Sequence, residues 1–431
     1  MKKLFTLIVI CSFMVNSAYG SGFQLNEHGA RAMAMAGAFT GLANDPSAVY
    51  FNPAGITQLS GTRFLAGVTL IAPSASFTGP QAPLSPALGA NKQWDMESQL
   101  FNPINFYVTQ QLSDDLFVGL GVNNQYGLGT KWDPKWAGRY LAGETEIQSF
   151  FFTGVVAYKL SDQFSISLGA VYSTATVLIA RQIPHPLGQA DVNIHMEGDA
   201  SSFGFTAGLM FKPSKEFSLG LSYRSEMTFD FEGTATSTPA TFYHPLLKAN
   251  LPFPNGDITA PLTTPQTITV GVGFMPSSDL TLTADFQYVG WSSYDKLAVT
   301  FKTYDLDLNP ANGQQNVQSA DRKYENSFIV RAGAEYNLSA DFTLRGGLLF
   351  DKSPAADEYV DPTLPDANRI GLNIGFGYKF TDRLSVDLAY MMLIFSDRDI
   401  TSSKTTVNNV PFLGKYSSSA NLFGFNISYN L

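Results

Sequence analysis

Apolar residues alternate with small or polar residues along many short stretches of the chain. In "FSISLGA", residues 164–170, every second side chain is apolar, and the same alternation holds in "LTLTADF", residues 280–286, and "LSVDLAY", residues 384–390. A period of two is that of a β-strand with one face in apolar surroundings. The pattern therefore predicts an all-β chain whose strands each present one apolar face.

A six-residue pattern recurs where such stretches begin. Its last residue is the first apolar residue of the following strand, and residues 328–336 alternate in the same phase before one copy. Ser, Asp and Pro within the pattern favour tight turns, so each copy is predicted to be the short turn of a β-hairpin. The six copies are "QLSDDL" from Gln111, "KLSDQF" from Lys159, "KPSKEF" from Lys212, "MPSSDL" from Met275, "NLSADF" from Asn337 and "KFTDRL" from Lys379.

The number of turns predicts the number of strands. Successive copies begin 42 to 63 residues apart, which leaves room for two strands and one long loop in each interval. Short turns at one end and long loops at the other are typical of outer-membrane barrels. If both termini lie at the short-turn end, six turns separate seven hairpins, or fourteen strands. We expect a 14-stranded antiparallel β-barrel over residues 61–431, with its last strand ending at Leu431.

The composition agrees with a membrane barrel and excludes several classes of function. Charged residues make up 15% of the chain and aromatic residues 13%, and no run of 18 apolar residues occurs beyond the N-terminus. The formal net charge of -9 argues against nucleic-acid binding. No phosphate-binding loop and no catalytic motif around the four His marks an enzyme, and no cofactor is expected.

Two polar features of the long loops have a functional and an ordinary interpretation. Asp351, Asp357, Asp361 and Asp366 could bind Ca²⁺, but their spacing matches no calcium motif, which favours a solvated acidic loop. His185 lies between two prolines in a predicted loop and is expected to be exposed.

The N-terminus has the features of a secretory signal. Residues 1–20 begin with a basic pair, continue with an apolar stretch over residues 4–15 and end in a small-x-small cleavage site. Cleavage there would leave Ser21 first and would remove Cys11, the only cysteine. Lipid attachment at Cys11 is the alternative. The signal predicts export to the bacterial outer membrane, where lipid and lipopolysaccharide would surround a monomeric barrel.

Residues 21–60 do not alternate and precede the first predicted strand. They are rich in small side chains, and Asp45 followed by Pro46 predicts a short helix that ends before a turn at "NPAG", residues 52–55. The helix is too short to cross a bilayer. We predict a small plug, or hatch, inside the barrel, and the alternative is a disordered periplasmic extension.

The inward face of the predicted strands carries many glycines and few charges. The charged positions are Asp285, Arg331, Glu335, Arg345 and Asp387. A weakly charged lumen favours apolar cargo, whereas the glycines could also relieve crowding around a plug.

Five segments stand out in order along the chain: "SGFQLNE" (21–27), "NPA" (52–54), "YRSEMTFDFEG" (223–233), "GWSSYDKL" (290–297) and "FDKSPAADEYVDPTLPDANR" (350–369). Together they resemble the FadL-type family of outer-membrane transporters for long-chain fatty acids and other hydrophobic compounds. The resemblance implies a fourteen-stranded barrel with an N-terminal hatch that includes Phe23 and the triplet Asn52, Pro53 and Ala54.

The resemblance also implies a passive mechanism. Substrate would be captured at the extracellular loops, pass to a pocket in the lumen, and leave sideways through a kink in the third strand after the hatch N-terminus moves. In the predicted third strand the alternation from Leu116 breaks at Asn123, Asn124, Gln125 and Tyr126, followed by Gly127. A polar run facing lipid is costly unless the strand bends away. We therefore predict a kink and a lateral gate there; the alternative is a strand that becomes a loop at the headgroup layer.

A fatty acid would need a cationic partner for its carboxylate. By analogy with the family, Arg181, Arg322 and Lys323 lie in suitable segments. If these side chains point outward, a neutral aromatic or aliphatic hydrocarbon becomes the better substrate. A general diffusion porin is the second alternative.

Overall fold

A computed structural model describes residues 22–81, 92–306 and 315–431. The predicted signal peptide, residues 1–20, and Ser21 lie outside the described residues. Within the described chain, no helix is both long and apolar enough to cross a bilayer.

Strands dominate the described residues, and the few helices are short. The helices are α2 (Ala30–Ala34), α3 (Ala48–Phe51) and the 3₁₀ segments η1 (Pro53–Gln58), η2 (Trp291–Ser293) and η4 (Asp357–Tyr359). The strands are β1 (Thr62–Gly79), β2 (Lys92–Asp95), β3 (Ile104–Gln111), β4 (Leu116–Asn123), β5 (Gly127–Lys131), β6 (Glu144–Lys159), β7 (Phe164–Ile183), β8 (Val192–Phe211), β9 (Phe217–Arg224), β10 (Met227–Thr238), β11 (Thr241–His244), β12 (Ala249–Pro252), β13 (Gly256–Thr264), β14 (Thr267–Phe274), β15 (Leu280–Val289), β16 (Lys296–Phe301), β17 (Val317–Asp321), β18 (Ser327–Asn337), β19 (Phe342–Asp351), β20 (Arg369–Lys379), β21 (Leu384–Phe395), β22 (Arg398–Ile400), β23 (Thr406–Val407), β24 (Val410–Pro411) and β25 (Gly414–Asn430).

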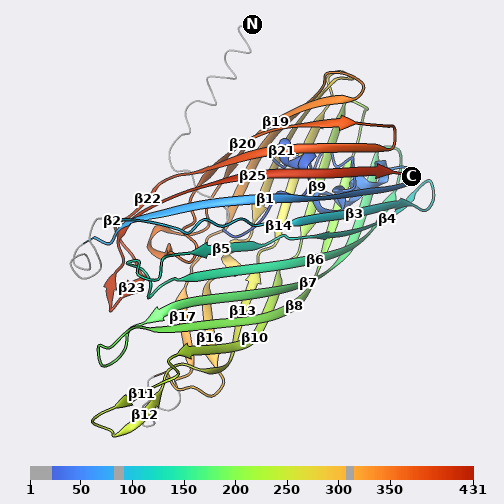
Figure 1. The fold of residues 1–431 in the computed structure, drawn as a ribbon. Coiled ribbons are helices and arrows are strands. Elements are labelled where there is room, and N and C mark those ends of the chain that lie inside the picture. The colour runs from blue at the N-terminus through green and yellow to red at the C-terminus, as the bar shows by residue number, and fades with distance from the viewer. Residues whose placement is uncertain (1–21, 82–91, 307–314) are drawn as a thin grey trace.

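The strands close into one antiparallel barrel (Figure 1). Within the described residues its wall contains 21 hydrogen-bonded segments, and seven pairs of consecutive segments continue one another, which leaves 21 − 7 = 14 strands. These pairs are β2/β3, β4/β5, β9/β10, β13/β14, β15/β16, β17/β18 and β21/β22. The first and last strands, β1 and β25, pair from Arg63↔Asn430 to Thr78↔Lys415 and so close the barrel. The predicted 14-stranded antiparallel barrel is confirmed.

All six repeated hexamers form the short turns between neighbouring strands. The last hexamer residue begins a strand in every case: β4, β7, β9, β15, β19 and β21 start at these positions. A hydroxyl inside the turn stabilises it; in the first, Ser113 Oγ accepts from the backbone N–H of Leu116 at 3.1 Å. Both chain ends of the barrel lie at this short-turn end, which is the periplasmic end of an outer-membrane barrel.

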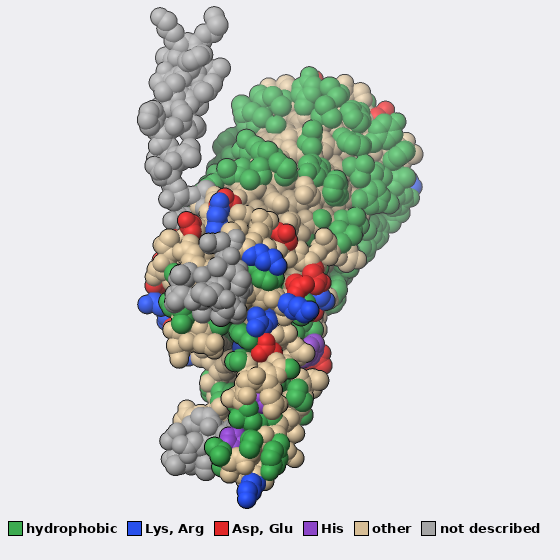
Figure 2. Space-filling model, turned by 60° about the vertical axis from the view of Figure 1, so that its left-hand side comes forward, with side chains coloured by type: hydrophobic (Ala, Val, Ile, Leu, Met, Phe, Trp, Pro, Cys, Tyr) green, Lys and Arg blue, Asp and Glu red, His purple; other side chains and the backbone are tan. Residues whose placement is uncertain are grey.

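The outer face of the wall is apolar over one part of the molecule and polar over the other. Alternate residues point outward, and large apolar side chains such as Leu168, Phe203 and Ile374 are 62 to 77% exposed. Figure 2 shows hydrophobic side chains gathered over one end, charged and polar side chains over the other end, and a mixture of hydrophobic and polar side chains on a protrusion. The apolar part has the character of a lipid-facing wall.

Residues 30–58 lie inside the barrel and touch opposite sides of its wall. Helix α2 packs against β19, β20, β21 and β25, whereas η1 packs against β4, β6, β7 and β8. The predicted helix from Pro46 begins later, at Ala48, because Asp45 first forms a turn in which its Oδ1 accepts from Ser47 N at 2.9 Å. The segment predicted to be a turn, "NPAG", instead begins η1.

The inward-facing glycines make room for this segment. A Cβ at Gly271 would lie 2.6 Å from the backbone nitrogen of Gly41, and one at Gly347 would lie 2.5 Å from the backbone of Met35. Each contact is too close for any side chain at the glycine position. The glycines therefore allow the N-terminal segment to lie against the wall.

Candidate functional site

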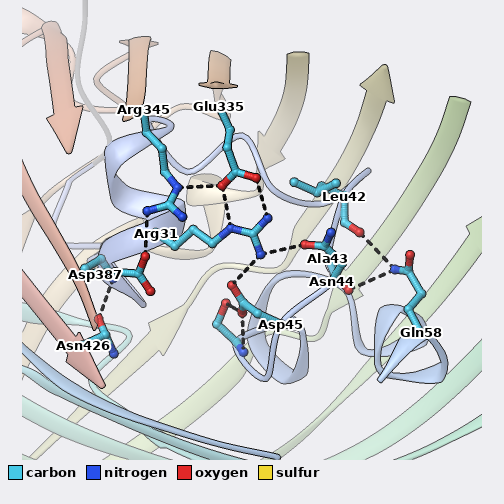
Figure 3. Close-up of polar contacts among 12 residues, drawn as sticks. Arg31, Leu42, Ala43, Asn44, Asp45, Gln58, Glu335, Arg345, Asp387 and Asn426 are labelled. Atoms are coloured by element: carbon cyan, nitrogen blue, oxygen red, sulfur yellow. Dashed lines mark hydrogen bonds and ion pairs between the residues drawn. The ribbon is translucent and has the colours of Figure 1, made fainter. Parts of the chain in front are cut away.

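Buried ion pairs attach the N-terminal segment to the barrel wall (Figure 3). Arg31 of α2 donates from Nε to Glu335 Oε2 at 2.8 Å and from Nη2 to Oε1 at 2.9 Å. Glu335 also accepts from Arg345 Nε at 2.6 Å, and Arg345 donates to Asp387 at 2.6 Å. Arg31 lies 3.4 Å from Asp45 of the same segment. Three of the inward charges noted in the sequence, on β18, β19 and β21, thus hold the segment instead of facing open space.

Polar side chains satisfy the backbone of the segment elsewhere. Asp285 of β15 accepts from the backbone N–H groups of Phe39 and Thr40 at 3.0 and 2.9 Å. Asn52 donates to Thr40 O at 3.1 Å and to Leu209 O of β8 at 3.0 Å, while its Oδ1 accepts from Ala54 N at 3.2 Å. Asn52 therefore ties η1 both to the segment and to the wall.

The triplet Asn52, Pro53 and Ala54 is buried at the start of η1. Pro53 occupies the first position of this 3₁₀ helix, where a missing N–H costs nothing. Burial and the hydrogen bonds of Asn52 thus hold the triplet in place within the lumen.

The third strand is interrupted where the sequence alternation fails. β4 ends at Asn123, β5 begins at Gly127, and Asn124, Gln125 and Tyr126 between them are all buried. Both segments pair with β6, so the chain turns inward and then rejoins the wall instead of becoming a loop.

Side chains replace the missing ladder bonds at this interruption. Asn124 Oδ1 accepts from Ile104 N at 2.8 Å, and its Nδ2 donates to Ser149 O at 2.6 Å. Ser149 Oγ donates to Tyr126 O at 2.6 Å. Asn124 thus bridges β3 and β6 across the gap in the wall, so an Asn side chain makes the cross-strand contacts that a continuous backbone would make.

Residues 23–25 pair with the interruption through an isolated antiparallel β-bridge. Leu25 N donates to Gln125 O at 2.9 Å, and Gly127 N donates to Phe23 O at 3.0 Å, around the bridge between Gln24 and Tyr126. The N-terminal end of the chain thereby occupies backbone groups that the interrupted strand leaves free.

Aromatic rings enclose Phe23. Its ring centroid lies 5.8 Å from Tyr126, 4.9 Å from Trp291 and 5.7 Å from Tyr294. Edge-on aromatic contacts at such distances are favourable. Trp291 and Tyr294 were not predicted as partners of Phe23, although both fall in the segment "GWSSYDKL".

The N-terminal end contacts buried titratable groups. Gly22 N donates to Asp366 Oδ2 at 3.3 Å, and burial raises the pKa of Asp366 to about 6. Burial, together with the nearby Arg224, lowers the pKa of His28 to about 3, and burial raises the pKa of Glu27. At neutral pH His28 is uncharged, and its Nε2 bonds Leu25 O at 2.9 Å. Residues 22–28 therefore lie in a water-poor environment.

Residues at the N-terminal end of the described chain line two cavities. The larger, of about 680 Å³, opens among the long-loop ends of the strands and has Phe23 at its base, with a lining that includes Tyr140, Met196, Phe231 and Leu262. The smaller, of about 370 Å³, lies at the interruption; Leu25, Tyr126, Ile104 and Phe150 line it. Ile104 and Phe150 also face outward from the wall, so the second cavity adjoins the lipid-facing surface.

The structure brings two of the three predicted carboxylate-binding residues, Arg181 and Arg322, to the larger cavity and leaves Lys323 outside it. Arg181 of β7 lines the larger cavity and donates to Tyr140 O at 2.8 Å, with no ion pair to any described residue. Arg322 also lines this cavity but is buried in an ion pair with Asp361. Lys323 pairs with Asp295 at 2.9 Å and is largely exposed.

The acidic loop is not a solvated cluster. Asp351 pairs with Arg369, Asp361 with Arg322 and Asp357 with Arg398. Asp366 is buried and accepts from Ser353 Oγ. No group of three or more His, Cys, Asp or Glu among the described residues could hold a metal ion. The prediction of a solvated loop was wrong for Asp351, Asp361 and Asp366, which are buried against arginines or Ser353, whereas the Asp357 side chain stays largely exposed.

Comparisons with known proteins show which family this chain matches. A sequence model of the family described as "Outer membrane protein transport protein (OMPP1/FadL/TodX)" matches residues 11–431. The chain is 26% identical to the long-chain fatty acid transport protein of Escherichia coli strain K12 over 99% of both chains, and 27% identical to outer membrane protein P1 of Haemophilus influenzae over the full length of both.

Solved structures share the fold. A FadL homologue of Pseudomonas aeruginosa superposes with a TM-score of 0.81 at 20% identity and covers 95% of this chain and all of its own. The P. putida toluene transporter TodX superposes with a TM-score of 0.74 at 17% identity, covering 94% of this chain and 99% of its own.

Proposed function

The chain belongs to the outer membrane protein transport protein family (OMPP1/FadL/TodX), whose β-barrels carry hydrophobic compounds across the bacterial outer membrane, and from this premise we propose that its substrate is a long-chain fatty acid. It is a transporter and not an enzyme. The relatives named as long-chain fatty acid transport proteins, which align over nearly the whole chain, support this choice.

The position of Arg181 at the larger cavity is the observation that supports this proposal most directly. Its guanidinium borders a cavity of mixed apolar and polar lining, which also includes the paired Arg322 and Asp361, and Arg181 itself bonds one backbone carbonyl and has no carboxylate partner within the described chain. An arginine left with free donors beside such a cavity is suited to bind one carboxylate. The volume of about 680 Å³ lies within the ordinary range of small-molecule sites.

The proposed route is passive and has three steps. The acid is captured in the larger cavity with its carboxylate on Arg181, and its chain displaces Phe23 from the ring of Tyr126, Trp291 and Tyr294. Residues 22–28 then leave the interruption, and the substrate passes through the smaller cavity. It leaves sideways at Asn124–Tyr126, where the hatch no longer covers the gap in the wall. The barrel and residues 30–58 stay fixed throughout, since buried ion pairs and tight backbone contacts hold them.

The experiment compares oleate binding by the wild type and by Arg181→Met. Met keeps the length and apolar stem of the side chain but removes the charge. We expect oleate affinity to fall about tenfold to a hundredfold, because a charged hydrogen bond contributes about 1.5–3 kcal/mol. Binding of methyl oleate, which has no carboxylate, should change little.

Lys323→Gln is the matched control, because Lys323 carries a charge on the same side but does not line the cavity. It should bind oleate like the wild type. Unchanged oleate binding by Arg181→Met would reject the carboxylate site.

A neutral hydrocarbon is the second candidate. The ring of aromatic side chains around Phe23 at the cavity base favours it, because such rings accept flat apolar molecules. Uptake of labelled oleate and of toluene by a strain without its own transporter separates the two. Uptake of toluene alone would assign the hydrocarbon.

A further inference from the structure

The hairpin β11–β12 forms the tip of the protrusion at the end of the barrel opposite the short turns (Figures 1 and 2). Its strands pair only with each other, from Thr241↔Pro252 to His244↔Ala249. The turn between them holds Leu246, which is 88% exposed, and Leu247, which is 63% exposed. Tyr243 beside them is also exposed. The hairpin therefore presents three large apolar side chains to its surroundings.

Large exposed apolar side chains also occur on the lipid-facing wall and in the short turns, where Leu112, Leu160, Leu338 and Phe380 are 53 to 59% exposed. Leu168, Phe203 and Ile374, at 63, 77 and 62% exposure, all point outward from wall strands. The hairpin is not an extension of the lipid-facing wall. The outward residues of β10 and β13 below it include Asp230, Glu232 and Asp257. These acidic side chains separate the tip from the apolar wall.

The stem holds the apolar tip outward. Phe242 and Phe253 contact each other at 4.9 Å between ring centroids, and His185 contacts them at 5.1 and 5.5 Å. His185 is therefore buried, contrary to the sequence expectation, because the hairpin folds over it. Phe253 N also donates to Ala240 O at 2.8 Å. The leucines are not drawn back into this cluster and remain available for contact.

The charge at the tip differs from that of the chain as a whole. Residues 239–254 contain no Asp or Glu but include His244 and Lys248, within a chain of formal net charge -9. Lys248 has a φ of +49°, which places it at the bend directly after the two leucines. Adjacent leucines, a tyrosine and one lysine are the combination that binds the boundary between lipid headgroups and acyl chains.

We propose that the β11–β12 tip docks on the surface of anionic lipid assemblies outside the cell. Leu246 and Leu247 enter the acyl region, Tyr243 lies at the headgroup level, and Lys248 contacts anionic headgroups. The occupant is a lipid surface and not a protein groove, because the tip is convex, carries no acidic side chain, and has Asn250 as its one exposed amide side chain. Docking would hold a source of hydrophobic molecules close to the mouth of the larger cavity. This inference holds whichever hydrophobic compound the barrel carries.

The test is co-flotation of the protein in phosphatidylcholine nanodiscs with separate vesicles of phosphatidylcholine and about one third phosphatidylglycerol. We expect the wild type to float with these vesicles. The double variant Leu246→Ser, Leu247→Ser should bind at least about tenfold more weakly, because two buried leucines contribute most of the apolar contact. Lys248→Glu should weaken binding to these vesicles but not to vesicles of phosphatidylcholine alone.

Two controls keep the test specific. Leu187→Ser alters an exposed leucine of a neighbouring loop and should float like the wild type. Arg181→Met should also float normally, which separates this inference from the proposed substrate site. Wild-type protein that fails to float, or a double leucine variant that floats equally well, would overturn the proposal.

Discussion

Arg31 and Glu335 lie 304 residues apart in the sequence and form a bidentate ion pair inside the barrel. The alternation of strand residues predicted that Glu335 faces inward, since Ile329, Arg331 and Glu335 share one phase. It could not predict the partner, because the N-terminal segment has no period that fixes which way Arg31 points. The weak charge of the lumen was interpreted as a sign of apolar cargo, but Arg31, Glu335, Arg345 and Asp285 bind the chain itself.

Removing one charge from this network should destabilise the molecule strongly. In Glu335→Gln, the guanidinium groups of Arg31 and Arg345 lose a shared carboxylate in a buried place, which costs about 3–5 kcal/mol. Thermal unfolding in detergent, followed by circular dichroism, should give a lower Tm. Trypsin should also cleave after Arg31, a bond that is inaccessible in the wild type.

Asp162→Asn is the control for this prediction. Asp162 is almost fully exposed and pairs only with Lys159 of a periplasmic turn, so the Tm should not change. An unchanged Tm in Glu335→Gln would mean that the ion pairs are not what holds the segment.

The interruption of the third strand is the irregular feature on which sequence and structure agree most closely. A polar run followed by glycine predicted a break at residues 123–127, and the structure interrupts the strand at residues 124–126. The contribution of residues 23–25 could not be predicted. They pair with a strand about 100 residues away through backbone groups, which carry no residue-specific signal. Whether the interruption acts as a gate stays a prediction.

A reversible cross-link between the two elements tests the gate. Gln24 and Tyr126 form a non-hydrogen-bonded antiparallel pair, the arrangement in which side chains lie closest and a disulfide fits best. With the signal peptide removed, the chain is expected to contain no other cysteine. The double variant Gln24→Cys, Tyr126→Cys should lose uptake of labelled oleate when oxidised and regain it after reduction.

Each single cysteine variant should transport equally well under both conditions. Normal uptake by the oxidised and fully cross-linked protein would mean that residues 23–25 do not need to move.

At the scale of the whole molecule, six short turns were enough to predict the number of strands. The turns have local chemistry, and a period of two needs no knowledge of distant partners. The long loops gave no such information: the cavities, the paired acidic loop and the buried His185 all depend on contacts between loops that are far apart in sequence. Fold class was therefore predictable in full, and the cavity lining only in part.

The filled lumen predicts how the molecule behaves toward hydrophilic solutes. Residues 30–56 are almost entirely buried against the wall and fill the lumen at their level. In liposome-swelling assays with small sugars we expect no permeation above that of empty liposomes, with a general porin as the positive control. Rapid, size-limited entry of sugars would instead assign the protein to diffusion porins.

The pairing of β1 with β25 has a consequence for the order of assembly. Residues 30–58 precede every strand of the barrel in the sequence, yet they are enclosed by a wall whose closing seam needs the seventeen-residue strand β25. Ala30 N bonds Asn426 of that last strand, so a contact of the plug is completed only when the chain is nearly finished. During assembly β1 and β25 must therefore stay unpaired until the N-terminal segment lies inside the lumen. Pairing of β25 with β1 thus determines when the N-terminal segment is enclosed.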